Sequence, residues 1–260
     1  MQETKIKRIV LLDEIRGFSL VCMILYHTFF LMSKIFKLEV GNFLFGFFRP
    51  LQPLISTLFI LVSGISARLS RSNLKRGLRL FGVAMGFSLV TIFVLPLIGL
   101  EDLGIYFGIL HFLSVSMLIF AGAQKLLDKL PPHWGLLVCF VLYFFTANIG
   151  KGYLGFSPST ALHLPKALYE SKFLFPLGIY GPSFHSADYF PLFPRIFMFL
   201  AATYLGLALL KADLPASVYK RHIKVFELLG KNSLLVYILH VPLIYVIIYA
   251  ALWVSQFFGG

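Results

Sequence analysis

Charged side chains are scarce in this chain of 260 residues, because Asp, Glu, Lys and Arg together make up only 13%. Soluble domains carry about 25% charged residues, and so few polar groups could not cover the surface of a soluble enzyme. Only two cysteines are present, Cys22 and Cys139, each within an apolar stretch. They exclude a disulfide scaffold. The 58% share of hydrophobic residues excludes a disordered protein.

Negative charge is scarcer than positive charge. The chain has 11 Asp and Glu against 23 Lys and Arg, which gives a formal net charge of +12. In a soluble protein this excess would suggest nucleic-acid binding. In a membrane protein it reflects Lys and Arg in cytoplasmic loops, so we expect no nucleic-acid partner.

Long apolar runs predict an all-α fold, a polytopic integral membrane helix bundle with about seven transmembrane helices in one domain over residues 1–260. The expected spans are residues 9–33, 53–69, 77–99, 103–124, 134–149, 190–210 and 231–256. Between them, residues 151–189 form a long outer loop with four prolines. A loop of this length is typical of a lid, a re-entrant element or a binding segment.

The distribution of basic residues predicts a cytoplasmic N-terminus. With that orientation, fifteen Lys and Arg lie in the inner segments, from Lys5 to Lys231, and six in the outer segments, from Lys34 to Lys172. This asymmetry follows the positive-inside rule. The first apolar run carries Asp13, Glu14 and Arg16, so we expect no cleaved signal peptide.

The first expected span holds the densest set of ionisable residues, Asp13, Arg16 and His27, which are costly inside a bilayer. Arg16 and His27 are eleven residues apart, so on an α-helix they share a face and lie about 16 Å apart along the axis. A cation therefore lies toward the cytoplasm and an imidazole toward the outside. A structural interpretation stays open, in which Arg16 snorkels, Asp13 caps or neutralises it, and His27 is a hydrogen-bonded packing residue.

Several motifs resemble a known family. Arg16 and His27 match the Arg-x10-His signature of transmembrane acyltransferases. The chain resembles more closely the bacterial branch related to the heparan-α-glucosaminide N-acetyltransferase catalytic domain. The matching stretches, in family order, are LDEIRG at 12–17, LFILVSGIS at 58–66, KRGLRLF at 75–81, GILH at 108–111, DYFPLFP at 188–194 and LGKNSLLVYILH at 229–240.

The resemblance implies an integral-membrane acyltransferase of the bacterial inner (plasma) membrane. Such a protein moves an acyl group from cytoplasmic acetyl-CoA or another acyl-CoA to a hydroxyl or amine of an extracytoplasmic glycan or amino sugar. Histidine suits the general base that this chemistry needs, which makes His27 the first candidate, with Arg16 and Asp13 as further catalytic candidates. Another family member has an amide residue at the matching position, so His27 is either the base or a residue that supports acceptor binding.

Cations at the cytoplasmic face are the candidates for binding the phosphates of the donor. Arg68, Lys75, Arg76 and Arg79, with Arg71 among them, place five positive charges in twelve residues. Arg76 and Arg79 share a helix face. The alternative is that this run is only a topology signal.

Four further residues are expected to shape the acceptor side: His111, His185, Asp188 and His240. His111 and His240 lie in expected spans, whereas His185 and Asp188 lie in the outer loop. Packing roles for the first two and a solvated pair for the others remain open. No paired histidine spacing supports a metal site, so we expect no metal.

Two other function classes remain open. A transporter or flippase of a lipid-linked sugar could use the same histidines as proton relays, although no internal repeat is evident. A non-catalytic membrane assembly protein would bind no acyl-CoA. The oligomeric state stays open, with a homo-oligomer among the alternatives.

Overall fold

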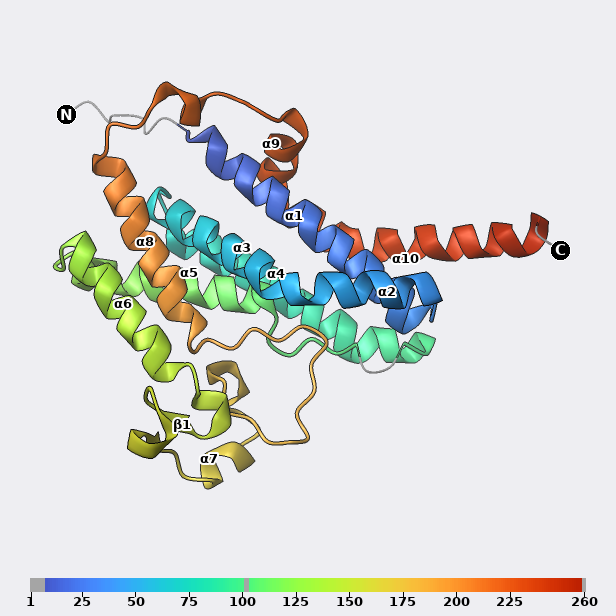
Figure 1. The fold of residues 1–260 in the computed structure, drawn as a ribbon, viewed down its shortest axis with the longest axis horizontal. Coiled ribbons are helices and arrows are strands. Elements are labelled where there is room, and N and C mark those ends of the chain that lie inside the picture. The colour runs from blue at the N-terminus through green and yellow to red at the C-terminus, as the bar shows by residue number, and fades with distance from the viewer. Residues whose placement is uncertain (1–7, 101–102, 259–260) are drawn as a thin grey trace. The chain divides into compact units, whose positions relative to one another are not determined.

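The computed structural model describes residues 8–100 and 103–258, and helices dominate them (Figure 1). The α-helices are α1 (Val10–Phe30), α2 (Glu39–Phe48), α3 (Gln52–Arg68), α4 (Asn73–Leu89), α5 (Ile109–Leu127), α6 (Pro132–Thr146), α7 (Ala167–Glu170), α8 (Arg195–Lys211), α9 (Lys224–Lys231) and α10 (Ser233–Phe258). Two-residue strands β1 (Tyr153–Leu154) and β2 (Leu162–His163) pair antiparallel, with Tyr153 opposite His163.

Each expected span contains a long helix, which confirms the all-α membrane fold. Within residues 8–100 and 103–258, six helical stretches are long and apolar enough to cross a membrane: Val10–Ile35, Glu39–Arg68, Asn73–Leu97, Ile109–Leu127, Pro132–Lys151 and Ser233–Gln256. The remaining expected span, 190–210, corresponds to α8, which has 17 residues. The chain is therefore a multi-pass membrane protein, and the expected count of about seven is close to the six found.

The chain divides into two compact units. The first consists of the described parts of Met1–Val62 and Asp213–Gly260. Within it, α1 packs against α2, α9 and α10, and α9 lies beside the first half of α1 (Figure 1). Glycines make this approach close: a Cβ atom on Gly17 would overlap the backbone oxygen of Phe226, and one on Gly230 would overlap that of Asp13.

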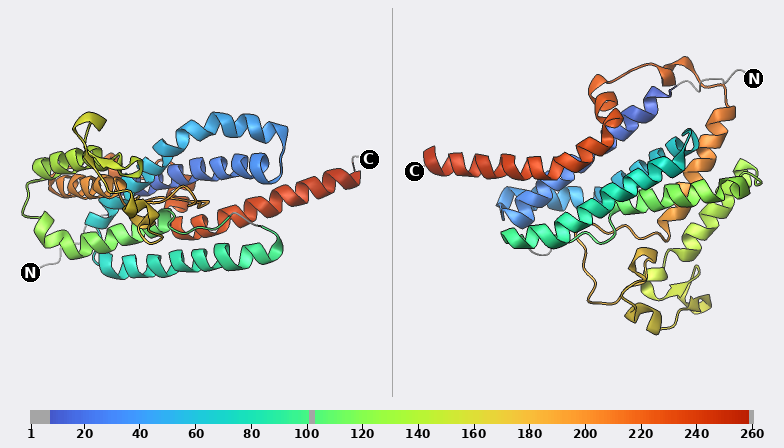
Figure 2. Two further views of the ribbon diagram at one scale, coloured as in Figure 1. Left: turned by 90° about the horizontal axis from the view of Figure 1, so that it is seen from below. Right: turned by 180° about the vertical axis from the view of Figure 1, so that it is seen from behind.

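The second unit is Ser63–Ala212. Helix α4 packs along α5, and α6 packs along α8 (Figure 2). Gly135 on α6 lies against the ring of Tyr204 on α8, because a Cβ atom at this position would overlap that ring. The core of this unit includes Phe112, Phe120 and Phe199, whose side chains are fully buried.

The expected outer loop, 151–189, belongs to this second unit. It holds the β1–β2 hairpin, the short helix α7 and 3₁₀ turns at Pro158–Thr160 and Phe175–Leu177. Rings of Phe175, Tyr180, Phe184 and Tyr189 pack on one another with centroids 5.0–5.4 Å apart. The loop is thus held by its own aromatic cluster, since aromatic pairs at these distances attract beyond their area burial.

Candidate active site

Two imidazoles meet in the first unit, one from α1 and one from α10. Nε2 of His240 lies 3.2 Å from Nδ1 of His27, and the ring centroids are 4.9 Å apart. The two residues are separated by 213 positions, so the contact comes from the packing of α10 on α1. His240 is buried, and His27 is partly buried.

Backbone carbonyls fix which ring nitrogens carry protons in this pair. Nδ1 of His27 lies 3.0 Å from the carbonyl oxygen of Met23, and Nδ1 of His240 lies 2.7 Å from that of Tyr237. A carbonyl oxygen only accepts, so both Nδ1 atoms are donors. In the neutral rings the single Nδ1–H of His27 is then shared between the oxygen of Met23 and Nε2 of His240, and Nε2 of His27 keeps its lone pair. Among the residues that the structure describes, this last nitrogen has no hydrogen-bond partner.

Asp13 and Arg16 lie one turn apart at the start of α1 and interact with each other. Arg16 Nη1 donates to Asp13 Oδ1 at 3.1 Å and to the backbone oxygen of Gly230 at 3.5 Å. Asp13 also accepts from Arg8 Nε at 2.6 Å. These contacts place Asp13 and Arg16 at the junction of α1 and α9. On an α-helix, Arg16 lies about 16 Å and Asp13 about 21 Å along the axis from His27.

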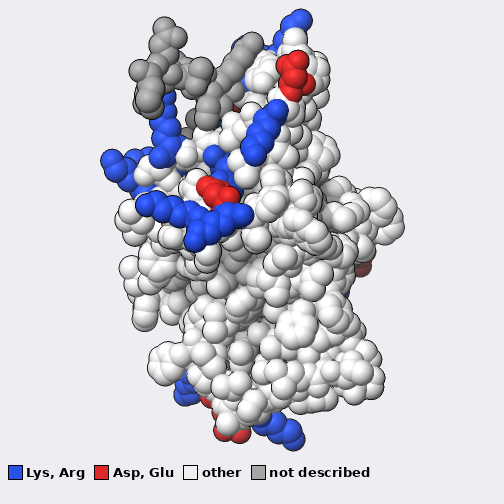
Figure 3. Space-filling view, turned by 90° about the vertical axis from the view of Figure 1, so that its left-hand side faces the viewer, with Lys and Arg blue, Asp and Glu red and all other residues white. Residues whose placement is uncertain are grey.

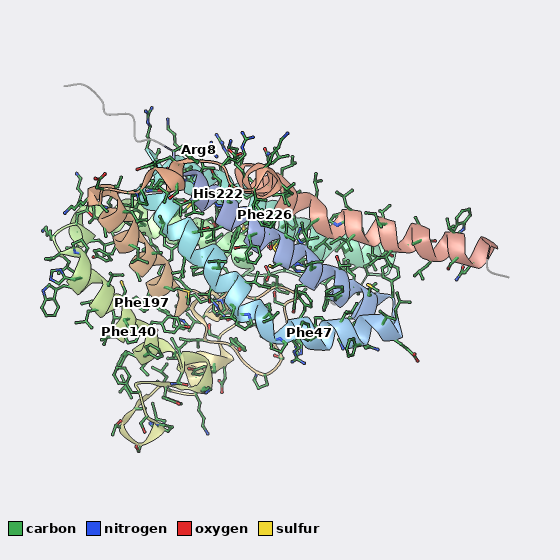
Figure 4. The ribbon with its side chains drawn as sticks, turned by 45° about the horizontal axis from the view of Figure 1, so that its top comes forward. Arg8, Phe47, Phe140, Phe197, His222 and Phe226 are labelled. Atoms are coloured by element: carbon green, nitrogen blue, oxygen red, sulfur yellow. The ribbon has the colours of Figure 1, made fainter. Side chains whose placement is uncertain are left out.

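Glu14, the next residue along α1, is a buried carboxylate that the sequence interpretation did not single out. Its Oε1 accepts from the backbone N–H groups of His222 and Ile223, at 2.6 and 2.9 Å, and its Oε2 lies 3.2 Å from Nδ1 of His222. Figure 4 labels His222 and Phe226 beside the start of α1. The signal in the sequence was the acidic pair 13–14 inside an apolar run, since a buried carboxylate requires partners.

Glu227 of α9 forms a second buried acidic centre in this unit. Its carboxylate pairs with Nε of Arg221 at 2.5 Å and with Nζ of Lys231. The hydrogen bond from Lys231 holds the pKa of Glu227 below its usual value, and the charge of Arg221 acts in the same direction.

The cations expected to bind the donor fall into two groups in the second unit. Lys75, Arg76 and Arg79 lie exposed on the first two turns of α4, which begins where Ser72 accepts from the backbone N–H of Lys75. In Figure 3 most of the Lys and Arg lie toward the top of the face that it draws and some at the bottom, with a broad area without charge between them. Exposed cations of this kind can bind phosphates.

Arg68 is different, because its side chain is buried. Nη1 donates to Asp128 at 2.6 Å, Nε donates to the backbone oxygen of Thr203 at 3.2 Å, and the guanidinium lies 5.0 Å from the ring centre of Phe120. It therefore joins α3, α5 and α8. Nη2 is buried without a hydrogen-bond partner in the part of the chain that the structure describes.

His111 lies buried on α5 beside Ser88 of α4, with its Nε2 3.2 Å from the serine oxygen. Ser88 donates to the backbone oxygen of Ile105 at 2.6 Å, so its oxygen accepts from His111. Rings of Phe81 and Phe107 lie within 6.4 and 5.6 Å of the imidazole centre. These contacts suit a packing residue that joins α4 to α5.

Asp188 and His185 lie three residues apart and contact different groups. Asp188 Oδ2 accepts from the backbone N–H of Ile109 at 2.9 Å and so caps the start of α5. His185 is exposed, with Nδ1 3.4 Å from the backbone oxygen of Ser183. The carboxylate therefore stabilises the helix that carries His111.

In the first unit, the structure brings His27 and His240 together and pairs Asp13 with Arg16. The second unit holds the exposed cations of α4, the buried Arg68 and His111, and the loop residues His185 and Asp188. Among described residues, no group of three or more His, Cys, Asp or Glu could hold a metal ion.

A comparison with protein families gives one match. The model described as heparan-alpha-glucosaminide N-acetyltransferase, catalytic, matches residues 8–242. The match runs through both units and includes all the candidate residues described above. No curated protein and no solved structure matched the chain.

Proposed function

This chain belongs to the heparan-alpha-glucosaminide N-acetyltransferase catalytic family, and from that membership we propose an integral-membrane acyltransferase. Its donor is acetyl-CoA or another acyl-CoA on the cytoplasmic side. Its acceptor is a hydroxyl or amine of an extracytoplasmic glycan or amino sugar. The protein lies in a bacterial inner membrane with its N-terminus in the cytoplasm, and residues 1–260 act as one catalytic domain, because the family match spans both units.

The observation that carries this proposal is the hydrogen-bonded pair of His27 and His240. Nδ1 of His27 lies 3.0 Å from the carbonyl oxygen of Met23 and donates its proton to it, so Nε2 of His27 is the basic nitrogen. A general base must present a free lone pair to the proton that it removes. His27 meets this requirement in the neutral form.

The reaction then needs one base that takes the proton of the sugar and one leaving group, the CoA sulfur. Nε2 of His27 takes the proton of the acceptor O–H or N–H as that oxygen or nitrogen attacks the thioester carbonyl carbon. The C–S bond breaks, the CoA sulfur leaves as the thiolate, and it receives the proton from His27. The products are the ester or amide and free CoA.

His240 stabilises the protonated state of His27 in this scheme. When Nε2 takes a proton, the ring becomes a cation whose Nδ1–H is still shared between the carbonyl oxygen of Met23 and Nε2 of His240, with Nδ1 3.0 and 3.2 Å from these atoms. A hydrogen bond from a charged donor is about 1.5–3 kcal/mol strong, which exceeds a neutral one. The contact is therefore stronger in the transition state than in the resting enzyme, as catalysis requires.

The exposed cations Lys75, Arg76 and Arg79 of α4 bind the phosphates of the donor. Arg68 holds the packing of the helix that precedes them. Asp13 positions Arg16, which serves the donor side. His111, His185 and Asp188 serve the acceptor side, where His111 acts by joining α4 to α5 and Asp188 by fixing the start of α5.

Product formation in detergent tests this function. The purified chain is incubated with acetyl-CoA and a panel of amino sugars, and products are identified by mass spectrometry. We expect an acetylated sugar and an equal amount of free CoA, with no sealed vesicle required. A transporter or an assembly protein forms neither, so the absence of both products across the panel, with a folded protein, would overturn the proposal.

A further inference from the structure

We infer that α9, together with the basic segment that leads into it, docks on the anionic phospholipid surface at the end of the membrane where α1 and α10 begin. This interaction surface, called here the α9 surface, consists of Lys220, Ile223, Lys224, Val225 and Leu228. It lies in the first unit and is independent of the transferase chemistry.

The position of α9 along its neighbours sets its depth. Gly230 contacts α1 at Asp13, in the first turn, and Phe226 contacts it at Gly17, one turn further in. The apolar stretch of α10 begins at Ser233, two residues after α9 ends. Both membrane-spanning helices therefore begin beside α9, which places it at the level of lipid headgroups (Figures 1 and 4).

One face of α9 is used for packing on α1 and the other has no partner among the described residues. Glu227 and Gly230 are buried on the packed face. Val225 and Leu228 are 61% and 58% exposed, and Ile223 just before the helix is 48% exposed. A short amphipathic helix with an outward aliphatic face at this depth is typical of an interfacial segment.

Charge decides which lipid the surface fits. Between residues 220 and 231 the chain carries four cations, Lys220, Arg221, Lys224 and Lys231, against one carboxylate. That carboxylate is buried and paired with Arg221 and Lys231. Lys220 and Lys224 are exposed, and a lysine stem can lie along apolar surface while its ammonium reaches a phosphate. Basic residues beside a membrane helix attract anionic lipid.

A lipid titration tests this inference. The whole chain in a neutral detergent is heated with increasing phosphatidylglycerol, or with phosphatidylcholine as the zwitterionic comparison, and the shift in Tm is followed. We expect phosphatidylglycerol alone to raise Tm. In the double variant Lys220→Glu and Lys224→Glu, the concentration for half the shift rises by at least about 25-fold, about fivefold for each cation removed. The matched control is the double variant Lys125→Glu and Lys129→Glu, in the last turn of α5 and just after it. This control keeps the wild-type Tm response to phosphatidylglycerol.

The depth of the α9 surface in a bilayer distinguishes lipid from a protein partner or solvent at this surface. A fluorophore is attached to Val225→Cys in a chain whose Cys22 and Cys139 are alanine, and the protein is reconstituted in bilayers that contain phosphatidylglycerol. We expect quenching by lipids labelled near the headgroup and little quenching by aqueous iodide. Equal Tm shifts in the two double variants, or a fluorophore quenched only by iodide, would overturn the inference and point to a protein partner or bare solvent.

Discussion

Replacing His240 by leucine removes the acceptor that faces Nδ1 of His27 and leaves the carbonyl of Met23 in place. The neutral tautomer of His27 therefore survives, and the loss is larger in the state in which His27 is protonated. The rate depends on the difference between a charge-assisted hydrogen bond, about 1.5–3 kcal/mol, and a neutral one, about 0.5–1.5 kcal/mol. This difference is about 1–1.5 kcal/mol, and each 1.36 kcal/mol is a factor of ten in rate. We expect kcat of His240→Leu to fall by about 5- to 13-fold.

Two amide variants separate this role from packing. In His240→Gln the side-chain amide reaches the former position of Nε2, 3.2 Å from Nδ1 of His27, so its oxygen accepts and most activity returns. In His240→Asn the amide reaches only the position of Nδ1, and the rate stays low. The assay is initial acetyl transfer at saturating acetyl-CoA in detergent, with Tm measured for each variant. A folded leucine variant with wild-type kcat, or equal rates for the two amide variants, would refute the reasoning.

Further outcomes follow from charge and packing. Arg76→Glu with Arg79→Glu should weaken acetyl-CoA binding by at least about tenfold in calorimetry, because phosphates lose two charge-assisted contacts. Gly230→Ala should lower Tm by several degrees, because its Cβ atom would overlap the backbone oxygen of Asp13 and overpacking costs about 1–3 kcal/mol. The lowered pKa of Glu227 predicts that its ion pairs stabilise the fold fully above about pH 4.3, the unfolded pKa, and progressively less below it. The Tm difference between wild type and Glu227→Gln should therefore shrink as the pH falls from 7 to below 4.

Each of these predictions has a control or a result that would contradict it. If Arg76→Glu with Arg79→Glu binds acetyl-CoA with unchanged affinity, the α4 cations only set the membrane topology and do not bind the donor. Gly82→Ala on α4, where nothing lies within 4 Å of the added Cβ atom, should leave Tm unchanged or raise it, since alanine restricts the unfolded chain. A Glu227→Gln difference that is constant with pH would contradict the ion-pair account.

The helices could be predicted from sequence because a run of about 20 apolar residues can satisfy its backbone in a bilayer only as a helix. The residues at which these helices begin could not be predicted from sequence. Helix α5 begins at Ile109 rather than at residue 103, and the carboxylate that caps it, Asp188, is 79 positions away. Helix α8 begins at Arg195 rather than at 190, directly after Pro194.

The sequence predicted which residue types form the candidate site and how far along α1 they lie. It did not predict which side chains they contact. Spacing along α1 placed Arg16 about three turns and Asp13 about four turns from His27. It could not show that His240 would face His27, since that contact depends on helix packing across 213 positions. Arg68 belonged to a basic run in the sequence, and only the tertiary structure shows it buried against Asp128.

The most direct test of the central claim is the rate of acetyl transfer by His27→Ala, measured beside wild type and His163→Ala, an exposed histidine on β2. General base catalysis contributes about 10²–10⁴-fold. The account predicts a loss of at least about 100-fold in kcat for His27→Ala, with acetyl-CoA binding and Tm close to wild type, and full activity for His163→Ala. Full activity in folded His27→Ala would contradict it.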